Sequence, residues 1–284
     1  MDLIMFTTVS PTYSLPERLK SDMAKHFAKR KVYCKADYAR ILAPYIDTCR
    51  NVTCYEASQG AGREDDEILV IRHDIDHDHV TALKIAAWEQ ERGLRTSYCV
   101  LHTAWYYGEL KNGKMRHSQD LVDLCVKLQA MGHEVMLHNN LVVAALQDGI
   151  DPVTFLHEEL EFFKSIGVAI HGTSSHGDRL CRELEFRNYE FFSETVWESR
   201  GGVRTIKHNG RELKLGQVSM QDFGLEYEAY DFPRDTYISE SGGNFRTREE
   251  TKGRGGMRRS ELTGVRPGRI IGVLTHPIWW NFDR

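Results

Sequence analysis

Ile68-Leu-Val-Ile-Arg-His-Asp-Ile-Asp-His-Asp-His79 is the stretch of sequence that decides the fold. Its first four residues are apolar and three of them are β-branched, which is typical of a buried strand in a parallel sheet. A dense group of ionisable side chains follows at once. In α/β barrels and doubly wound sheets, functional sites lie at the carboxyl ends of such strands. The stretch therefore predicts an α/β fold with a site at the end of this strand.

The ionisable group contains three Asp and three His within residues 73–79. Asp74 and Asp76 are two positions apart, so in extended backbone their side chains point to the same side. Two carboxylates at a strand end can divide the chemistry, one binding a metal ion and the other acting as a base. The alternative is a solvated turn with scattered charges, but this density of ionisable residues favours a site.

The same pattern of an apolar strand followed by ionisable residues recurs along the chain. Strands are predicted at 96–101, 134–137, 168–170 and 269–274, with helices at 80–93, 118–131 and 152–166 between them. His138, His171, His176 and His276 follow three of these strands. If the strands are parallel, the groups converge on one rim. One Asp and two His form a ligand set for a divalent cation such as zinc, and this combination fits hydrolysis of an amide or ester.

The rest of the chain is less regular. Residues 1–65 are predicted to form an N-terminal helical extension, with helices within 17–31 and 37–49. A long loop is expected at 102–117, short strands at 217–220 and 236–239, and a mobile surface loop at 246–260, which is polar and glycine-rich. No linker divides the chain, so the sequence predicts a single domain over residues 1–284.

Composition excludes several classes of protein. A net charge of −4 over 284 residues gives no sign of nucleic-acid binding. The first ten residues lack the pattern of a signal peptide, and no segment is apolar enough for stable membrane insertion, so a cytoplasmic location is expected. The six Cys form no C-x-x-C pair. Their even number would allow disulfides, but Cys99 and Cys125 fall in apolar periodic segments and are interpreted as core thiols.

Five segments together resemble a known family. They are Ile71-Arg-His-Asp-Ile-Asp76, Gly132-His-Glu-Val-Met-Leu-His138, Ser174-Ser-His-Gly177, Tyr237-Ile-Ser-Glu-Ser-Gly-Gly243 and Leu274-Thr-His-Pro-Ile-Trp-Trp280. In content and order they resemble the polysaccharide deacetylases of the NodB-homology type (carbohydrate esterase family 4). The chain is most similar to the divergent branch found in surface-polysaccharide and lipopolysaccharide biosynthesis. The resemblance covers roughly residues 65–280.

The resemblance implies a distorted (β/α)7 barrel and a metal-dependent deacetylase. It implies Asp74 as the catalytic base, Asp76 and His138 as metal ligands, and His276 as the general acid. The family places a second His four residues after the first, but here that position is Val142. We expect His176 to replace it as a ligand to the divalent metal ion, and zinc is the expected ion.

The resemblance also implies a set of residues around the substrate. The arginine that orients the family's base has no obvious counterpart, and Arg246, paired with Glu240, is the candidate. Trp279 and Trp280 are interpreted either as an apolar wall for the substrate or as core residues. The expected substrate is an N-acylated sugar that carries an acetyl or formyl group. Two other functions stay open: a carbohydrate-binding barrel that has lost its metal, and a metal-dependent hydrolase of a non-sugar amide.

Overall fold

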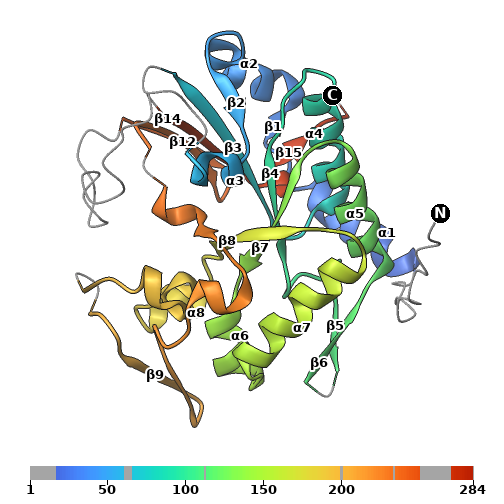
Figure 1. Ribbon diagram of the computed structural model, residues 1–284. Helices are drawn as coiled ribbons and strands as arrows, with labels where there is room; N and C mark the ends of the chain where they lie inside the picture. The colour runs from blue at the N-terminus through green and yellow to red at the C-terminus, as the bar shows by residue number, and fades with distance from the viewer. Residues whose placement is uncertain are drawn as a thin grey trace, which may run out of the picture.

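The computed structural model describes residues 17–60, 66–111, 113–198, 201–232, 234–249 and 270–283. Its centre is a curled sheet with seven parallel strands and with helices packed around it (Figure 1). In spatial order these strands are β11 (Tyr227–Glu228), β8 (Ile170–Ser175), β7 (Glu134–Asn139), β4 (Ser97–Leu101), β3 (Ile68–Ile75), β14 (Ile270–Thr275) and β12 (Thr236–Ser241). Antiparallel β13 (Asn244–Glu249) follows β12, and β2 (Arg50–Val52) lies parallel to the start of β3. The predicted α/β class is confirmed, with a sheet compatible with a distorted barrel.

Helices connect most of the parallel strands and cover the outer face of the sheet. The α-helices are α1 (Glu17–Ala28), α2 (Lys35–Ile46), α3 (Cys54–Ser58), α4 (His79–Gln90), α5 (Gln119–Ala130), α6 (Leu141–Asp148), α7 (Pro152–Ser165) and α8 (Arg179–Glu183). Short 3-10 helices are η1 (Asn188–Phe191), η2 (Ser193–Thr195), η4 (Met220–Phe223), η5 (Ala229–Asp231) and η6 (Pro277–Trp279). Side-chain caps start several of the predicted helices, as when Asp151 accepts from the backbone N–H of Thr154 before Pro152.

β3 lies in the middle of the sheet, and all eight of its residues are buried. Ile71 and Ile75 face outward into the apolar clusters beneath the helices, whereas Val70 faces the inside of the curled sheet. Burial on both faces explains why the strand is a continuous apolar run rather than an alternating one. The inward face of β3 ends at Asp74, where the strand gives way to the bend that carries Asp76.

The N-terminal segment is part of the sheet framework rather than only a helical extension. α1 lies within the predicted helical region 17–31, and α2 overlaps the region 37–49 but starts two residues earlier. β1 (Tyr33–Cys34) pairs with β15 (Trp280–Asn281). Lys31 forms an ion pair with Asp78, at the start of α4, and donates to the carbonyl of Pro277. Residues 1–16 and 61–65 lie outside the described ranges.

Other boundaries correct the sequence-based expectations. The predicted loop at 102–117 contains a hairpin of β5 (Gly108–Lys111) and β6 (Lys114–His117), and a second hairpin joins β9 (Thr205–His208) to β10 (Arg211–Lys214). At 217–220, only Val218 makes a bridge, to Phe192. Residues 246–249 belong to β13, and the remainder of the predicted loop, 250–260, lies outside the described residues. Both hairpins consist largely of polar and charged residues. A short exposed hairpin has no buried face, so its sequence carries no alternating apolar pattern that predicts strands.

Two further expectations concern cysteines and membranes. All six cysteines are free thiols, and Cys99 and Cys125 are completely buried, as predicted for core residues. Among the described helices, none combines the length and the apolar character needed to span a bilayer.

Candidate metal centre

Residues from separate strand ends converge on one cavity of about 460 Å³. Asp74 and Asp76 come from the end of β3, His138 from β7, and His176 and His276 from the residues directly after β8 and β14. All five line the cavity. Because the strands are parallel, their carboxyl ends lie at the same edge of the sheet, and this is the arrangement that the sequence predicted.

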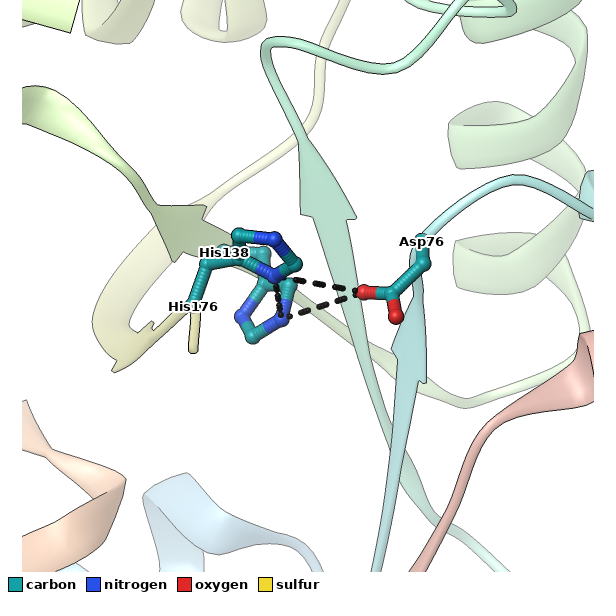
Figure 2. Close-up of side chains that lie close together, drawn as sticks. All are labelled: Asp76, His138 and His176. Atoms are coloured by element: carbon teal, nitrogen blue, oxygen red, sulfur yellow. Dashed lines mark hydrogen bonds and ion pairs between the residues drawn. The ribbon is translucent and has the colours of Figure 1, made fainter. Parts of the chain in front are cut away.

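Asp76, His138 and His176 form a tight group of candidate metal ligands, the ligand group, within this cavity (Figure 2). Oδ1 of Asp76 lies 3.4 Å from Nε2 of His138 and 3.4 Å from Nδ1 of His176. The two imidazole nitrogens are 3.1 Å apart. One oxygen and two nitrogens therefore face a common point from three sides, so a single cation could contact all three.

The electrostatics of the group suit a bound cation. Oδ1 of Asp76 is buried and has no hydrogen-bond partner, which leaves a carboxylate oxygen available as a ligand. Burial opposes ionisation of Asp76, but His138 and His176 outweigh it, so its pKa lies well below the usual value. The carboxylate is thus charged at neutral pH. One oxygen and two imidazole nitrogens are a common donor set for a divalent metal ion.

Each ligand histidine is held by groups behind it. Nδ1 of His138 donates to the carbonyl of Ser174 at 2.8 Å, which directs Nε2 toward the cavity. The backbone N–H of His176 donates to the carbonyl of Asn139, and its own carbonyl accepts from the side chain of Asn188. These bonds fix β8 against β7 at the point where both histidines leave the sheet.

Asn188 also explains the structural role of Val142. Val142 is completely buried in the apolar core, in the first turn of α6. Oδ1 of Asn188 accepts from the N–H groups of Val142 and Val143, at 3.1 and 3.3 Å, and so satisfies the start of that helix. Position 142 is therefore a core position of a capped helix, and His176 occupies the third corner of the ligand group.

Arg72 is the arginine that contacts Asp74. Its Nε lies 3.0 Å from Oδ1 of Asp74, and its Nη2 donates to Oδ2 at 3.2 Å. Both side chains are almost completely buried. Burial opposes ionisation of Asp74, but the charge of Arg72, helped by His138 and His276, outweighs it and lowers the pKa of the carboxyl. Oδ2 of Asp74 lies 3.7 Å from Nε2 of His138 and 4.0 Å from Nε2 of His276, between the ligand group and His276.

His276 is oriented by Glu240 on the neighbouring strand. Its Nδ1 donates to the backbone carbonyl of Glu240 at 2.8 Å, while its backbone N–H donates to a carboxylate oxygen of the same residue. The Nε2 atom is thereby directed toward Asp74. Burial opposes protonation of His276, but Glu240 and the two aspartates outweigh it and raise its pKa to about 9.

The residues predicted to contact substrate occupy different places. Trp279 lines the cavity and packs over Gly243, whereas Trp280 is buried in the core. Glu240 is completely buried behind His276 and does not line the cavity, which corrects the contact we expected with substrate. Arg246 belongs to β13, where its backbone lies opposite Ser239 of β12. Its side chain is outside the described part of the structure, so the role expected for it stays a prediction.

Sequence reasoning missed Arg72 and Asn188 and placed His171 at the wrong end of its strand. Arg72 had a detectable signal, since it is two residues before Asp74 and therefore on the same strand face. Asn188 had no such sequence signal, because it belongs to a 3-10 helix and contacts Asn140, which is 48 positions earlier in the chain. β8 begins at Ile170, so His171 lies at its start, where it pairs with Glu226 and stacks on Tyr55.

Comparison of the chain with protein-family models, with curated proteins and with solved structures finds no match.

Proposed function

We propose that this protein is a metal-dependent amide hydrolase that removes an acyl group from an N-acylated sugar, as the resemblance to polysaccharide deacetylases implies. One observation carries the proposal. The ligand group of Asp76, His138 and His176 lies beside an Arg72-paired carboxylate, Asp74, and a histidine, His276, which approach each other to 4.0 Å. This arrangement supports a mechanism in which a cation, a base and an acid act around one cavity. Surface-polysaccharide or lipopolysaccharide biosynthesis is the context that the resemblance favours.

The spacing of the three ligand atoms supports zinc as the cation. Zinc binds nitrogen and oxygen ligands at about 2.0–2.1 Å in tetrahedral geometry, so the ligand atoms of such a site are about 3.3 Å apart. The three separations in the group are 3.1, 3.4 and 3.4 Å. Three protein ligands would leave a fourth position for water or substrate, as in catalytic zinc sites.

The residues of the chain then supply the proton transfers. A zinc ion held by the group would act as a Lewis acid that lowers the pKa of water and polarises the acyl carbonyl. Asp74, which Arg72 keeps ionised, accepts a proton from the water while the water oxygen bonds to the acyl carbon. His276 donates a proton from Nε2 to the nitrogen as the carbon–nitrogen bond breaks. The products are a carboxylic acid and the free amine of the sugar.

Protonation states agree with these roles at neutral pH. The pKa of Asp74 is lowered, so this group can accept a proton, and that of His276 is raised to about 9, so this group can donate one. A divalent cation nearby would reduce the shift of His276 by repulsion. The two groups thus have their pKa values moved apart by their surroundings, as acid–base pairs in enzymes require.

The test combines metal analysis with an activity assay. The purified protein is analysed for zinc and other divalent metals, and amine release is measured from N-acetyl- and N-formyl-amino sugars. We expect about one zinc ion per chain, and amine release that stops with a chelator and returns with zinc. If no divalent ion is retained and no acylated sugar releases amine, the proposal is wrong. Non-sugar amides in the same assay separate the sugar hydrolase from a hydrolase of other amides.

A further inference from the structure

A second cavity, of about 590 Å³, lies inside the curled sheet below the candidate metal centre. Its walls come from the inner sides of β3, β14, β12 and β11, and from α3 and η4. β11 and β12 are the end strands of the parallel path, and among the described strands they do not pair with one another. The cavity lies in the gap between these two strands, with Tyr227 of β11 on one side and Tyr237 of β12 on the other.

Small residues leave this part of the sheet interior open. In closed barrels, layers of large branched side chains fill the space inside the strands. Here Cys54, Ala57 and Ser58 of α3 form one wall, and Gly272 of β14 contributes no side chain. The aliphatic part of Arg234 crosses over Gly272, since a Cβ added there would lie 2.9 Å from Cδ of Arg234.

The walls favour an apolar occupant. Apolar side chains come from several elements: Val70, Met220, Leu225, Phe232, Ile270 and Leu274. The two arginines are already engaged, Arg72 by Asp74 and Arg234 by the carbonyl of Ala229 and the ring of Tyr237. An ionic ligand would therefore find little uncompensated charge on the guanidinium groups.

Three of the four acidic residues in the walls, Glu194, Glu226 and Glu228, have hydrogen-bond or ion-pair partners. Burial raises the pKa of Glu228 to about 8, so this carboxyl is mostly protonated at neutral pH, and it bonds Thr173 and the backbone N–H of Ser175. Glu194 accepts from the backbone N–H of Met220, and Glu226 pairs with His171. Asp231 is the exception: burial raises its pKa to about 7, and its Oδ1 has no hydrogen-bond partner, so one polar point remains in a largely apolar wall.

The second cavity adjoins the metal centre. Tyr237 and Leu274 line both cavities. Arg72 lines the second cavity and contacts Asp74 in the first, and the ring of Tyr230, which lines the first, lies over the Arg72 guanidinium at 5.1 Å. A group that extends from an acyl carbon beside Asp74 toward the sheet interior would therefore meet Leu274 and Tyr237, with open space beyond them.

We propose that the second cavity holds the hydrocarbon chain of the substrate's acyl group. The preferred substrates are then amino sugars with a medium-length N-acyl chain, rather than the acetyl or formyl groups expected from sequence. This inference rests on the proposed function, because it assumes that an acyl carbon reacts beside Asp74. The reaction is unchanged: water and the amide give a fatty acid and the free amine.

A chain-length series tests the proposal. The zinc-loaded protein is assayed with N-acetyl-, N-butanoyl-, N-hexanoyl- and N-octanoylglucosamine, and kcat/KM is measured for each. We expect kcat/KM to rise with chain length by about fourfold per methylene buried. A steady fall in kcat/KM from acetyl to octanoyl would overturn the proposal.

A filled cavity gives the matched comparison. Ala57→Trp places an indole in the wall formed by α3, which is not among the elements that carry the ligand group. We expect it to abolish the gain with octanoyl and to leave the acetyl substrate within about twofold. Ala57→Leu fills less space and serves if the Trp variant does not fold. Ala130→Trp, at an exposed position of α5, is the control. Equal effects of Ala57→Trp on acetyl and octanoyl substrates would contradict the proposal.

A binding measurement separates this inference from the proposed function. Calorimetry with the purified protein compares N-octanoylglucosamine with N-acetylglucosamine, in wild type and in Ala57→Trp. If the octanoyl compound binds more tightly and the variant removes that advantage while no substrate is hydrolysed, the cavity binds an acyl chain but the hydrolase proposal fails. If the acetyl compound is hydrolysed but the octanoyl chain brings no gain in binding or rate, the cavity proposal fails alone.

Discussion

The two faces of β3 carry two clusters of buried ionisable groups, and the clusters differ in how completely their atoms are hydrogen-bonded. On the outer face, Glu89 of α4 accepts four side-chain hydrogen bonds, two on each oxygen. The donors are Tyr38, His73, Thr96 and Tyr98. On the inner face, Oδ1 of Asp76 has no hydrogen-bond partner.

The comparison separates a cluster that stabilises the fold from one that can bind a ligand. Both contain a carboxylate and histidines, and both are close to β3, so residue type does not distinguish them. What distinguishes them is whether their polar atoms have hydrogen-bond partners. A fully hydrogen-bonded buried network rigidifies a core, whereas buried polar atoms without partners are expected where an ion or substrate binds. We therefore expect substitutions on the outer face to change stability and those on the inner face to change activity.

The largest effect should come from Asp74→Asn. The amide cannot accept the proton, so kcat should fall about a thousandfold. The midpoint of thermal unfolding should fall as well, because the buried guanidinium of Arg72 loses its charged partner, so kcat is measured well below that midpoint. Amine release and thermal melts measure the two quantities. Asp78→Asn is the matched control, because Asp78 lies in the same acidic segment but is bonded to Lys31 and Thr81. A Asp74→Asn variant with wild-type kcat would remove Asp74 from the mechanism.

The outer cluster should respond to Glu89→Gln with a loss of stability. The substitution replaces a charged acceptor with an amide whose NH₂ group faces hydroxyl donors. We expect the free energy of unfolding to fall by about 3 kcal/mol at neutral pH, as measured by urea denaturation. Zinc affinity should stay within about twofold of wild type. Equal stability of the two proteins would show that the network does not stabilise the fold.

The same residue predicts a dependence on pH. Burial opposes ionisation of Glu89, but His73 and the hydrogen bonds outweigh it and lower its pKa from 4.5 to about 2. A lowered pKa in the folded state stabilises the protein above pH 4.5, and this contribution is lost as the pH falls toward 2. The difference in stability between wild type and Glu89→Gln should therefore be constant above pH 5 and shrink below 4.5. Urea denaturation of both proteins between pH 7 and pH 3.5 measures this difference. A difference that stays constant over the whole range would contradict the prediction.

Asn188→Asp should weaken the metal site without touching a ligand. The variant keeps the acceptor for the N–H groups of Val142 and Val143 but loses the donor to the carbonyl of His176. Groups that hold metal ligands typically change affinity by about 10- to 100-fold. Titration with Co²⁺, followed by its visible absorption, measures the change. Asn209→Asp, in the exposed β9–β10 turn, should bind Co²⁺ like wild type.

The smallest effect is expected at the hydrogen bond that links the outer cluster to the strand before His276. Nδ1 of His73 lies 2.6 Å from the hydroxyl of Thr275, the residue before His276. Thr275→Val keeps the shape and removes the hydrogen bond, so stability should fall by about 1 kcal/mol with kcat within twofold of wild type. A tenfold loss of kcat would instead show that the outer cluster positions His276.

Sequence predicted the inner cluster better than its supports. The parallel strands and the five converging side chains followed from apolar runs that end in Asp or His, because such runs have a local and periodic signature. The bonds from Asn188 had no such signature: those to α6 span 46 positions of the chain, and the one to His176 comes from a 3-10 helix with no periodic apolar pattern. The outer network was missed for the same reason: Glu89 lies on a helix, and only packing against β3 reveals that it is completely buried.

The pairing of β14 with β3 has a consequence for the order in which the protein is made. His73 and Thr275, which lie opposite each other in this pair, are 202 positions apart in the chain. During synthesis, the backbone edge of β3 that pairs with β14 stays unpaired until β14 has emerged. Contacts of such long sequence separation form slowly and leave strand edges open to mispairing. Because His276 follows β14, the nascent chain would gain His276, the proposed acid, only after the strands that carry Asp76, His138 and His176 have been made.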